Sequence, residues 1–280
     1  MPRIGAHVSI AGGLERAFAR GEELSCETIQ IFTKNQLQWR SAPISQGRAE
    51  RFLRAWGESS IADVIVHSSY LINLAATDAT GEKSIAALED ELERCDILGI
   101  EDLVLHPGSS KGNPADQSLD LMSERLKTVL ERTAHTRVNI LLETMSGQGN
   151  HLGSDFGQLR RIFENLDWEP RMGVCLDTCH MFASGLDFRT EPTYRRLLGH
   201  IDSSVGLDRV RCWHFNDSAH PLGRKLDRHA HIGEGELGTT PFSLILTDPL
   251  WEDVPCILET PLEGAGHGRD IAILRKLRGR

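Results

Sequence analysis

The chain has 280 residues, of which 40% are hydrophobic and 25% are charged, and its formal net charge is −9. This size suits one large α/β domain with a full core, and the acidic balance argues against a protein that binds nucleic acid through a broad electrostatic surface. The first residues lead directly into an apolar segment without a signal region, and no segment is long and apolar enough to cross a membrane, so we expect a cytoplasmic protein.

Short apolar segments alternate with amphipathic segments along the chain. The expected strands are residues 3–8, 27–32, 61–67, 102–106, 138–143, 173–177, 209–215 and 254–259. The clearest expected helices are residues 84–98, 119–130 and 270–277, in which apolar residues recur at helical spacing. Apolar strands that alternate with helices are typical of a parallel sheet covered on both faces, and eight such units without a linker predict an α/β protein with a TIM (β/α)8 barrel. We expect residues 1–280 to form this single domain.

Six expected strands end in a side chain that binds hard or borderline divalent metals. These six are His67, His106, Glu143, Asp177, His214 and Glu259. A single such residue is equally consistent with an ordinary polar side chain at a barrel rim, but a parallel barrel brings all its strand ends together, where its active site also lies. Three further candidates, His180, Asp227 and His229, follow in the loops beyond the strands. Nine candidates exceed the needs of one ion and predict a polynuclear metal centre.

The donor types narrow the choice of metal. Buried carboxylates are costly unless cations neutralise them, and imidazoles with carboxylates favour Zn²⁺ over Mn²⁺ or Fe²⁺. Cys175 and Cys179 have a C-x-x-x-C spacing, but no second pair completes a thiolate site, so we expect the cysteines to be buried, reduced thiols. His231 has a spacing that would let it replace His229 as a ligand.

Several short motifs together resemble one known family. They are G-A-H-V-S at residues 5–9, F-T-K-N-Q at 32–36, Y-L-I-N-L at 70–74, H-P-G-S at 106–109, G-V-C-L-D-T-C-H at 173–180, N-D at 216–217, D-R-H at 227–229 and G-E-G at 233–235. From residue 4 to about residue 262, the chain is similar to the endonuclease IV family of zinc-dependent apurinic/apyrimidinic (abasic-site) endonucleases.

The resemblance implies a TIM barrel with three Zn²⁺ ions at the C-terminal face of its strands. One ion would be held by His67, His106 and Glu143, a second by Glu143, Asp177, His214 and Glu259, and the third by His180, Asp227 and His229. The implied reaction belongs to base excision repair. It hydrolyses the phosphodiester 5′ to an abasic site in duplex DNA and leaves a 3′-hydroxyl and a 5′-deoxyribose phosphate. Glu143 and Glu259 would be catalytic, around a metal-bridging hydroxide.

The same resemblance assigns DNA contacts to two loops. Asn35 and Gln36 would touch the DNA backbone or the gap left by the base, and Tyr70 and Leu71 would wedge into the base stack. Leu37 stands where some relatives carry an arginine, and a leucine can still wedge but adds no charge. An alternative is that residues 69–74 form a short helix whose tyrosine and leucine are core residues. The implied partner is duplex DNA with abasic sites or 3′-blocking lesions, bound by a monomer.

Two other classes of function remain as alternatives. A metal-dependent sugar isomerase or epimerase on a similar barrel would also use strand-end Glu, Asp and His, with one or two metals. The additional D-R-H set and the T-K-N-Q loop argue against it. A non-catalytic module that recognises damaged DNA or stores metal has no need of such a complete ligand set.

Overall fold

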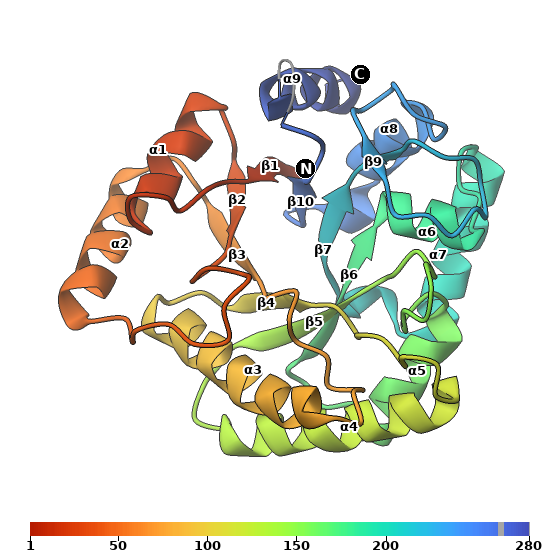
Figure 1. The fold of residues 1–280 in the computed structure, drawn as a ribbon. Coiled ribbons are helices and arrows are strands. Elements are labelled where there is room, and N and C mark those ends of the chain that lie inside the picture. Colours follow the sequence, from red (N-terminus) through yellow and green to blue (C-terminus); the bar gives the residue numbers. More distant parts are fainter. Residues whose placement is uncertain (263–265, 280) are drawn as a thin grey trace.

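Eight parallel strands close into a barrel, and the helices form an outer ring around them (Figure 1). The computed structural model describes residues 1–262 and 266–279. Around the barrel the strand order is β1-β10-β7-β6-β5-β4-β3-β2. The strands are β1 Arg3–His7, β2 Thr28–Ile31, β3 Asp63–His67, β4 Asp102–Leu105, β5 Asn139–Glu143, β6 Met172–Asp177, β7 Val210–Phe215 and β10 Pro255–Leu258. The expected TIM barrel is therefore confirmed.

The helices follow the strands in the expected alternation. They are α1 Arg16–Glu23, α2 Gln46–Glu58, α3 Ala79–Ile97, α4 Ala115–Arg132, α5 Phe156–Asn165, α6 Thr178–Ser184, α7 Glu191–Ser204, α8 Thr240–Thr247 and α9 Gly266–Arg278. The expected helices at 84–98, 119–130 and 270–277 are present, and each starts about one turn earlier. In α3 the reason is a cap, because the Asp78 carboxylate accepts a hydrogen bond from the Thr80 N–H at 2.8 Å.

The inward-facing side chains of the strands explain why the candidate ligands meet. Six of them form a separate apolar cluster inside the barrel: Ile65, Val104, Leu141, Cys175, Cys212 and Ile257. Side chains two positions apart on a strand point to the same face. Two residues beyond each member of this cluster stand His67, His106, Glu143, Asp177, His214 and Glu259. All six therefore enter the same interior, one level above its apolar floor.

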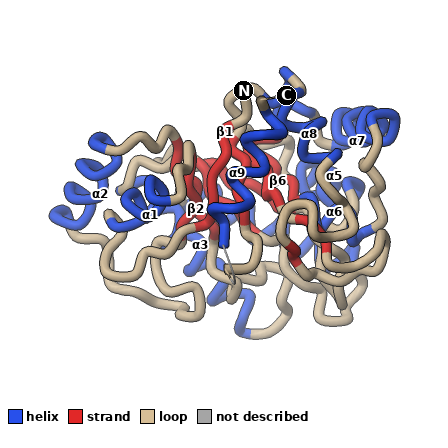
Figure 2. Tube along the Cα trace, turned by 90° about the horizontal axis from the view of Figure 1, so that it is seen from above, coloured by secondary structure: helices blue, strands red, loops and turns tan. Residues whose placement is uncertain are grey.

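The long loops gather on one side of the barrel, away from the chain ends (Figure 2). Helix α9 packs against β1 and β10, and its Arg278 bonds Glu27 Oε1 at 2.6 Å and the Pro2 carbonyl at 2.8 Å. Two short strands, β8 Asp217–Ser218 and β9 His229–Ala230, form an antiparallel pair within the long loop after β7. Among the described residues, no helix combines the length and hydropathy that crossing a membrane requires.

Candidate metal centre

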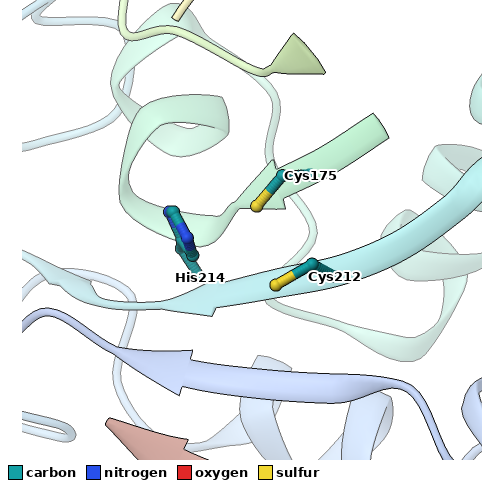
Figure 3. A group of neighbouring side chains, drawn as sticks. All are labelled: Cys175, Cys212 and His214. Carbon is teal, nitrogen blue, oxygen red and sulfur yellow. The ribbon is translucent and has the colours of Figure 1, made fainter. Parts of the chain in front are cut away.

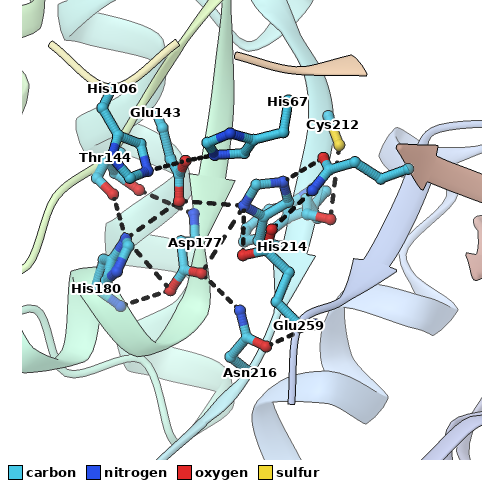
Figure 4. A network of polar contacts seen from close by, with 12 residues as sticks. His67, His106, Glu143, Thr144, Asp177, His180, Cys212, His214, Asn216 and Glu259 are labelled. Atoms are coloured by element: carbon cyan, nitrogen blue, oxygen red, sulfur yellow. Dashed lines mark hydrogen bonds and ion pairs between the residues drawn. The ribbon is translucent and has the colours of Figure 1, made fainter. Parts of the chain in front are cut away.

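The Glu143 carboxylate lies at the centre of the candidate site (Figure 4). It ends β5 and is fully buried. Its Oε2 atom lies 3.3 Å from His67 Nε2 and 3.0 Å from His106 Nε2, whereas Oε1 lies 3.1 Å from His214 Nδ1 and 3.2 Å from His180 Nδ1. Each oxygen thus faces a different group of imidazoles. This is the geometry that a carboxylate shared between two cation positions requires.

The end of β6 carries two candidate ligands because the strand leads directly into a helix. Asp177 is the last residue of β6 and also the N-cap of α6, and its Oδ1 accepts a hydrogen bond from the His180 N–H at 2.6 Å. The expectation that His180 lies in a loop is wrong, because this capped first helical turn holds it. His180 Nδ1 is 2.9 Å from the Thr144 carbonyl, so its Nε2 points the other way.

The long loop after β7 supplies the last two candidates. His229 lies in β9, and its Nε2 is 3.4 Å from Asp227 Oδ1, while His180 Nε2 is 3.2 Å from Asp227 Oδ2. The spacing of two residues indeed turns both side chains the same way. His231, the alternative ligand, turns elsewhere: its Nδ1 lies 2.8 Å from Asp270 Oδ2 on α9.

The buried carboxylate of Asp217 holds this loop in place. Its Oδ1 accepts from the N–H groups of Ser218 and Leu237 at 2.7 and 2.9 Å, and its Oδ2 from those of Gly233 and Gly235 at 2.9 and 3.1 Å. A Cβ on Gly235 would lie 2.5 Å from Asp217 Oδ1, so only glycine allows this approach. The N-D and G-E-G motifs are therefore one structural unit, which fastens the segment that carries Asp227.

The nine predicted ligands fall into three groups whose donor atoms lie within 4.8 Å of one another. The groups are His67, His106 and Glu143; Glu143, Asp177, His214 and Glu259; and His180, Asp227 and His229. Within the part of the chain that the structure describes, the buried Nε2 atoms of His180 and His229 approach Asp227 but form no hydrogen bond of adequate geometry. This is costly for an imidazole unless a ligand occupies the space. The donor set and these two atoms fit divalent cations, and metal binding stays a prediction.

The outer nitrogens of the imidazoles are held as they are in metal sites. His67 Nδ1 lies 2.7 Å from the Ser68 carbonyl, and His229 Nδ1 lies 3.1 Å from that of Glu259. A backbone carbonyl accepts the Nδ1–H proton, which leaves Nε2 as a free donor of electrons to a cation. These rings, like that of His180, therefore present Nε2 to the centre.

Charges in the centre compensate one another. Burial would raise the pKa of Glu143, but His214 and His106 hold it well below its ordinary range. Although burial acts in the opposite direction, the neighbouring carboxylates raise the pKa of His180 and His214 well above the ordinary value. A cation bound here would replace protons on these imidazoles, so metal binding would be coupled to proton release.

Cysteines lie beside the centre but are poor candidates for ligands. Cys175 and Cys212 are neighbours on β6 and β7, and His214 follows on β7 (Figure 3). Both thiols are fully buried in the apolar floor, and burial raises the pKa of Cys175 well above its ordinary value. Burial also raises the pKa of Cys179 to about 12. Metals bind thiolates, which this environment disfavours, so the expected structural role of the cysteines fits the geometry.

The T-K-N-Q loop is anchored by a buried ion-pair cluster on α3. The Lys34 side chain is 1% exposed, and its Nζ lies 2.6 Å from Asp90 Oδ2 and 3.4 Å from Glu91 Oε1. Thr33 Oγ1 donates to Glu91 Oε2 at 2.7 Å. Lys34 is thus a structural residue. The sequence alone could not show this, because a lysine in a predicted DNA-binding loop could equally contact a phosphate.

The predicted DNA-contacting side chains lie at the mouth of the centre. Leu37 is 68% exposed and Tyr70 is 53% exposed, so both side chains are accessible to a bound partner. The Tyr70 ring lies 5.2 Å from the His67 ring and 5.6 Å from the His106 ring. Residues 69–74 form turns without a helix, so the alternative that Tyr70 and Leu71 are helical core residues is wrong.

The loops that carry these side chains are joined to each other. Asn35 Oδ1 accepts from the Leu37 N–H at 2.9 Å, which closes a turn with its own side chain. The Gln36 carbonyl accepts from Ser69 Oγ at 2.6 Å, directly before Tyr70. The two predicted DNA-binding segments thus form one surface.

Sequence reasoning missed two buried amides that hold the ligands. Asn216 Nδ2 donates to Asp177 Oδ2 at 2.7 Å, and its Oδ1 accepts from the Glu259 N–H at 3.0 Å. Gln30 Nε2 donates to Glu259 Oε1 at 2.7 Å, and its Oε1 lies 2.8 Å from His214 Nε2. The alternation along β2 does place Gln30 on the inward face of the barrel, which could have indicated a role in the site. It was missed because an amide side chain is not a typical metal ligand.

Comparison with known proteins defines the class of this barrel and then its family. A family model described as a xylose isomerase-like TIM barrel matches residues 18–277. The probable endonuclease 4 of Chloroflexus aurantiacus is 45% identical over 281 residues, which cover 99% of this chain and 98% of the relative. The crystal structure of endonuclease IV from Thermus thermophilus matches with a TM-score of 0.87 and 34% identity, and covers 99% of this chain and 98% of its own. The chain belongs to the endonuclease IV family, as its motifs predicted.

The barrel alone is shared more widely. A D-tagatose 3-epimerase-like protein matches with a TM-score of 0.75 at 16% identity, and it shows the fold alone. The choice between an endonuclease and a sugar epimerase therefore rests on the family and on the third group of candidate ligands, which lies beyond the barrel strands.

Proposed function

We propose that this protein is a DNA-repair endonuclease which hydrolyses the phosphodiester 5′ to an abasic site in duplex DNA, leaving a 3′-hydroxyl and a 5′-deoxyribose phosphate. The observation that carries the proposal is the convergence of nine nitrogen and oxygen ligands into three adjoining groups at the barrel mouth. Membership of the endonuclease IV family supports it. The proposal includes three Zn²⁺ ions per chain and a single domain over residues 1–280.

Bound Zn²⁺ would supply a water molecule of lowered pKa and electrophilic stabilisation of the phosphate and the leaving oxygen. The residues of the chain hold this arrangement in place. Glu143 would connect the first two groups, because its two oxygens face different imidazoles. Glu259 Oε2 lies 3.3 Å from His214 Nδ1 and would orient the attacking water, while its Oε1 is engaged elsewhere.

DNA would be selected by the exposed apolar side chains beside the centre. Tyr70 stands over the first group of imidazoles, and Leu37 projects from the neighbouring loop. Apolar wedges between base steps lower the cost of extruding a nucleotide, and an abasic nucleotide has no stacking to lose. We expect Tyr70→Ala and Leu37→Ser to weaken binding to abasic duplex more than binding to intact duplex.

The direct test is cleavage of a duplex that carries a stable abasic analogue. The purified protein should nick the strand 5′ to the lesion without added Mg²⁺, should tolerate brief EDTA treatment, and should contain about three metal ions per chain, as its three ligand groups imply. Metal-loaded protein that leaves the duplex intact would exclude the proposal. Isomerisation or epimerisation of a sugar by the same preparation would favour the alternative.

A second test separates chemistry from binding. Glu259→Gln should lower the cleavage rate by orders of magnitude and spare DNA affinity, because Glu259 would act on the reacting water. Within the described residues its carboxylate contacts Gln30, His7 and His214, outside the predicted DNA-contacting residues. Glu234→Gln, at an exposed residue of the same face that pairs with Arg269, is the matched control and should cleave like the wild type. Equal losses of rate and of affinity in Glu259→Gln would contradict its catalytic role.

A further inference from the structure

One fully buried amide connects three residues at the edge of the candidate metal centre. Gln30 lies on β2, two residues beyond the inward-facing Thr28, and is 0% exposed. Its Oε1 lies 2.8 Å from His214 Nε2, and its Nε2 lies 2.7 Å from Glu259 Oε1 and 3.0 Å from His7 Nδ1. Every polar atom of the side chain is thus engaged. Such a buried, fully bonded amide fixes the orientation of its partners.

His214 differs from the other imidazoles in the nitrogen that it presents. His67, His180 and His229 give Nδ1 to a backbone carbonyl and turn Nε2 inward. His214 is reversed: its Nδ1 lies 3.1 Å from Glu143 Oε1 and 3.3 Å from Glu259 Oε2, and its Nε2 faces Gln30. An acceptor at Nε2 keeps the proton on that nitrogen and leaves Nδ1 free to bind a cation.

The same amide gives the two carboxylate oxygens of Glu259 different partners. Gln30 Nε2 donates to Oε1, whereas Oε2 faces His214 Nδ1 in the second ligand group. The donor therefore selects which oxygen is directed towards the cation. Because the amide accepts from one ligand and donates to the other, a single side chain sets the orientation of both.

We propose that Gln30 is a positioning residue of the second ligand group, which makes His214 a ligand through Nδ1 and Glu259 a ligand through Oε2. The inference rests on the metal centre of the proposed function. Removal of partners that orient metal ligands typically weakens metal binding by about 10–100-fold. The two halves of the amide are separable, since an ionised glutamate at this position accepts from His214 but has no proton to donate to Glu259.

The test compares Gln30→Met, which keeps the length and removes the contacts with His214, Glu259 and His7, with Gln30→Glu. The matched control is Thr28→Val, at the inward-facing position below. Among the described residues, Thr28 Oγ1 donates only to the Asp63 carbonyl, at 3.1 Å. Zinc affinity is measured by competition with a chelator, and ¹⁵N NMR of the zinc-loaded proteins identifies the nitrogen of His214 that binds metal. Gln30→Met should release its weakest-bound zinc about 10–100-fold more readily and should lose the single Nδ1-bound signal of His214. Gln30→Glu should keep that signal.

Three results would overturn the proposal. The first is a zinc affinity of Gln30→Met within about twofold of the wild type with an unchanged His214 signal, well below the loss expected of an orienting partner. The second is an equal loss in Thr28→Val, which would assign the effect to core packing. The third is loss of the signal in Gln30→Glu. None of these readouts involves DNA, so a wild-type protein that binds zinc normally but fails to cleave abasic duplex overturns the proposed function alone.

Discussion

Asp217→Asn tests whether the hydrogen bonds of the Asp217 carboxylate stabilise the loop that carries Asp227 and His229. Each Asp217 oxygen accepts two backbone N–H bonds, and burial raises the pKa of this carboxyl while the four donors oppose that rise. In either orientation an asparagine places its NH₂ group against two N–H groups. Two hydrogen bonds to a charged group are then lost, at about 1.5 kcal/mol each or about 3 kcal/mol in total.

Because the loop can open without unfolding the barrel, amide hydrogen exchange is the appropriate assay. A loss of about 3 kcal/mol corresponds to about a 100-fold decrease in protection, since 1.4 kcal/mol is a factor of ten. We expect this decrease at the amides of Gly233, Gly235 and Leu237, with the strands unchanged, and faster metal loss from the third ligand group. Asp187→Asn, whose carboxylate pairs with Arg189 on the same face, is the control. A decrease below about threefold, or an equal decrease in the strands, would refute this reasoning.

Two further predictions concern buried and partly buried ion pairs. Lys34→Met leaves Glu91 buried without its cation and should destabilise the protein by about 3 kcal/mol in chemical denaturation, because removal of one partner of a buried pair typically costs about 3–5 kcal/mol. Adding Glu91→Gln should recover part of the loss, and no recovery would contradict this account. Burial would raise the pKa of Glu27, but Arg278 and the Ile4 N–H lower it below its ordinary value. The ionised Glu27 therefore contributes to the free energy of unfolding above its unfolded pKa of about 4.3, and this contribution is lost as pH falls through its folded pKa. Urea midpoints of metal-free wild type and Glu27→Gln should differ at pH 7 and converge once the pH falls below the folded pKa of Glu27. A difference that persists in acid would show that the charge is not responsible.

Much of the candidate centre follows from local pattern. The six strand-end candidate ligands stand two residues beyond inward-facing apolar residues. This spacing is visible in the sequence once the strands are located. The alternation of strands and helices predicted the barrel, and the ends of helices were placed less well. The amphipathic pattern of α3 begins only where the helix meets the core, and the Asp78 cap that starts the helix lies before it.

Long-range contacts decided what local pattern could not. Tyr70 and Leu71 are residue types that are common in protein cores, but the turn after β3 leaves Tyr70 at the surface beside His67. A lysine such as Lys34 is normally expected at the surface, but α3 covers it and supplies two carboxylates that pair with its charge. His229 and His231 are both possible ligands by spacing, but in the folded chain His229 faces Asp227 whereas His231 is bonded to Asp270 on α9.

The sequence determined the barrel and the identity of the nine candidate ligands, because strand and helix periodicities are local and a parallel barrel necessarily brings its strand ends together. The tertiary structure decided which nitrogen and which oxygen each ligand presents. Gln30 and Glu259 are 229 residues apart in the chain, and they meet at 2.7 Å only after the barrel closes. The orientation of an imidazole or a carboxylate depends on such partners, which no local pattern encodes.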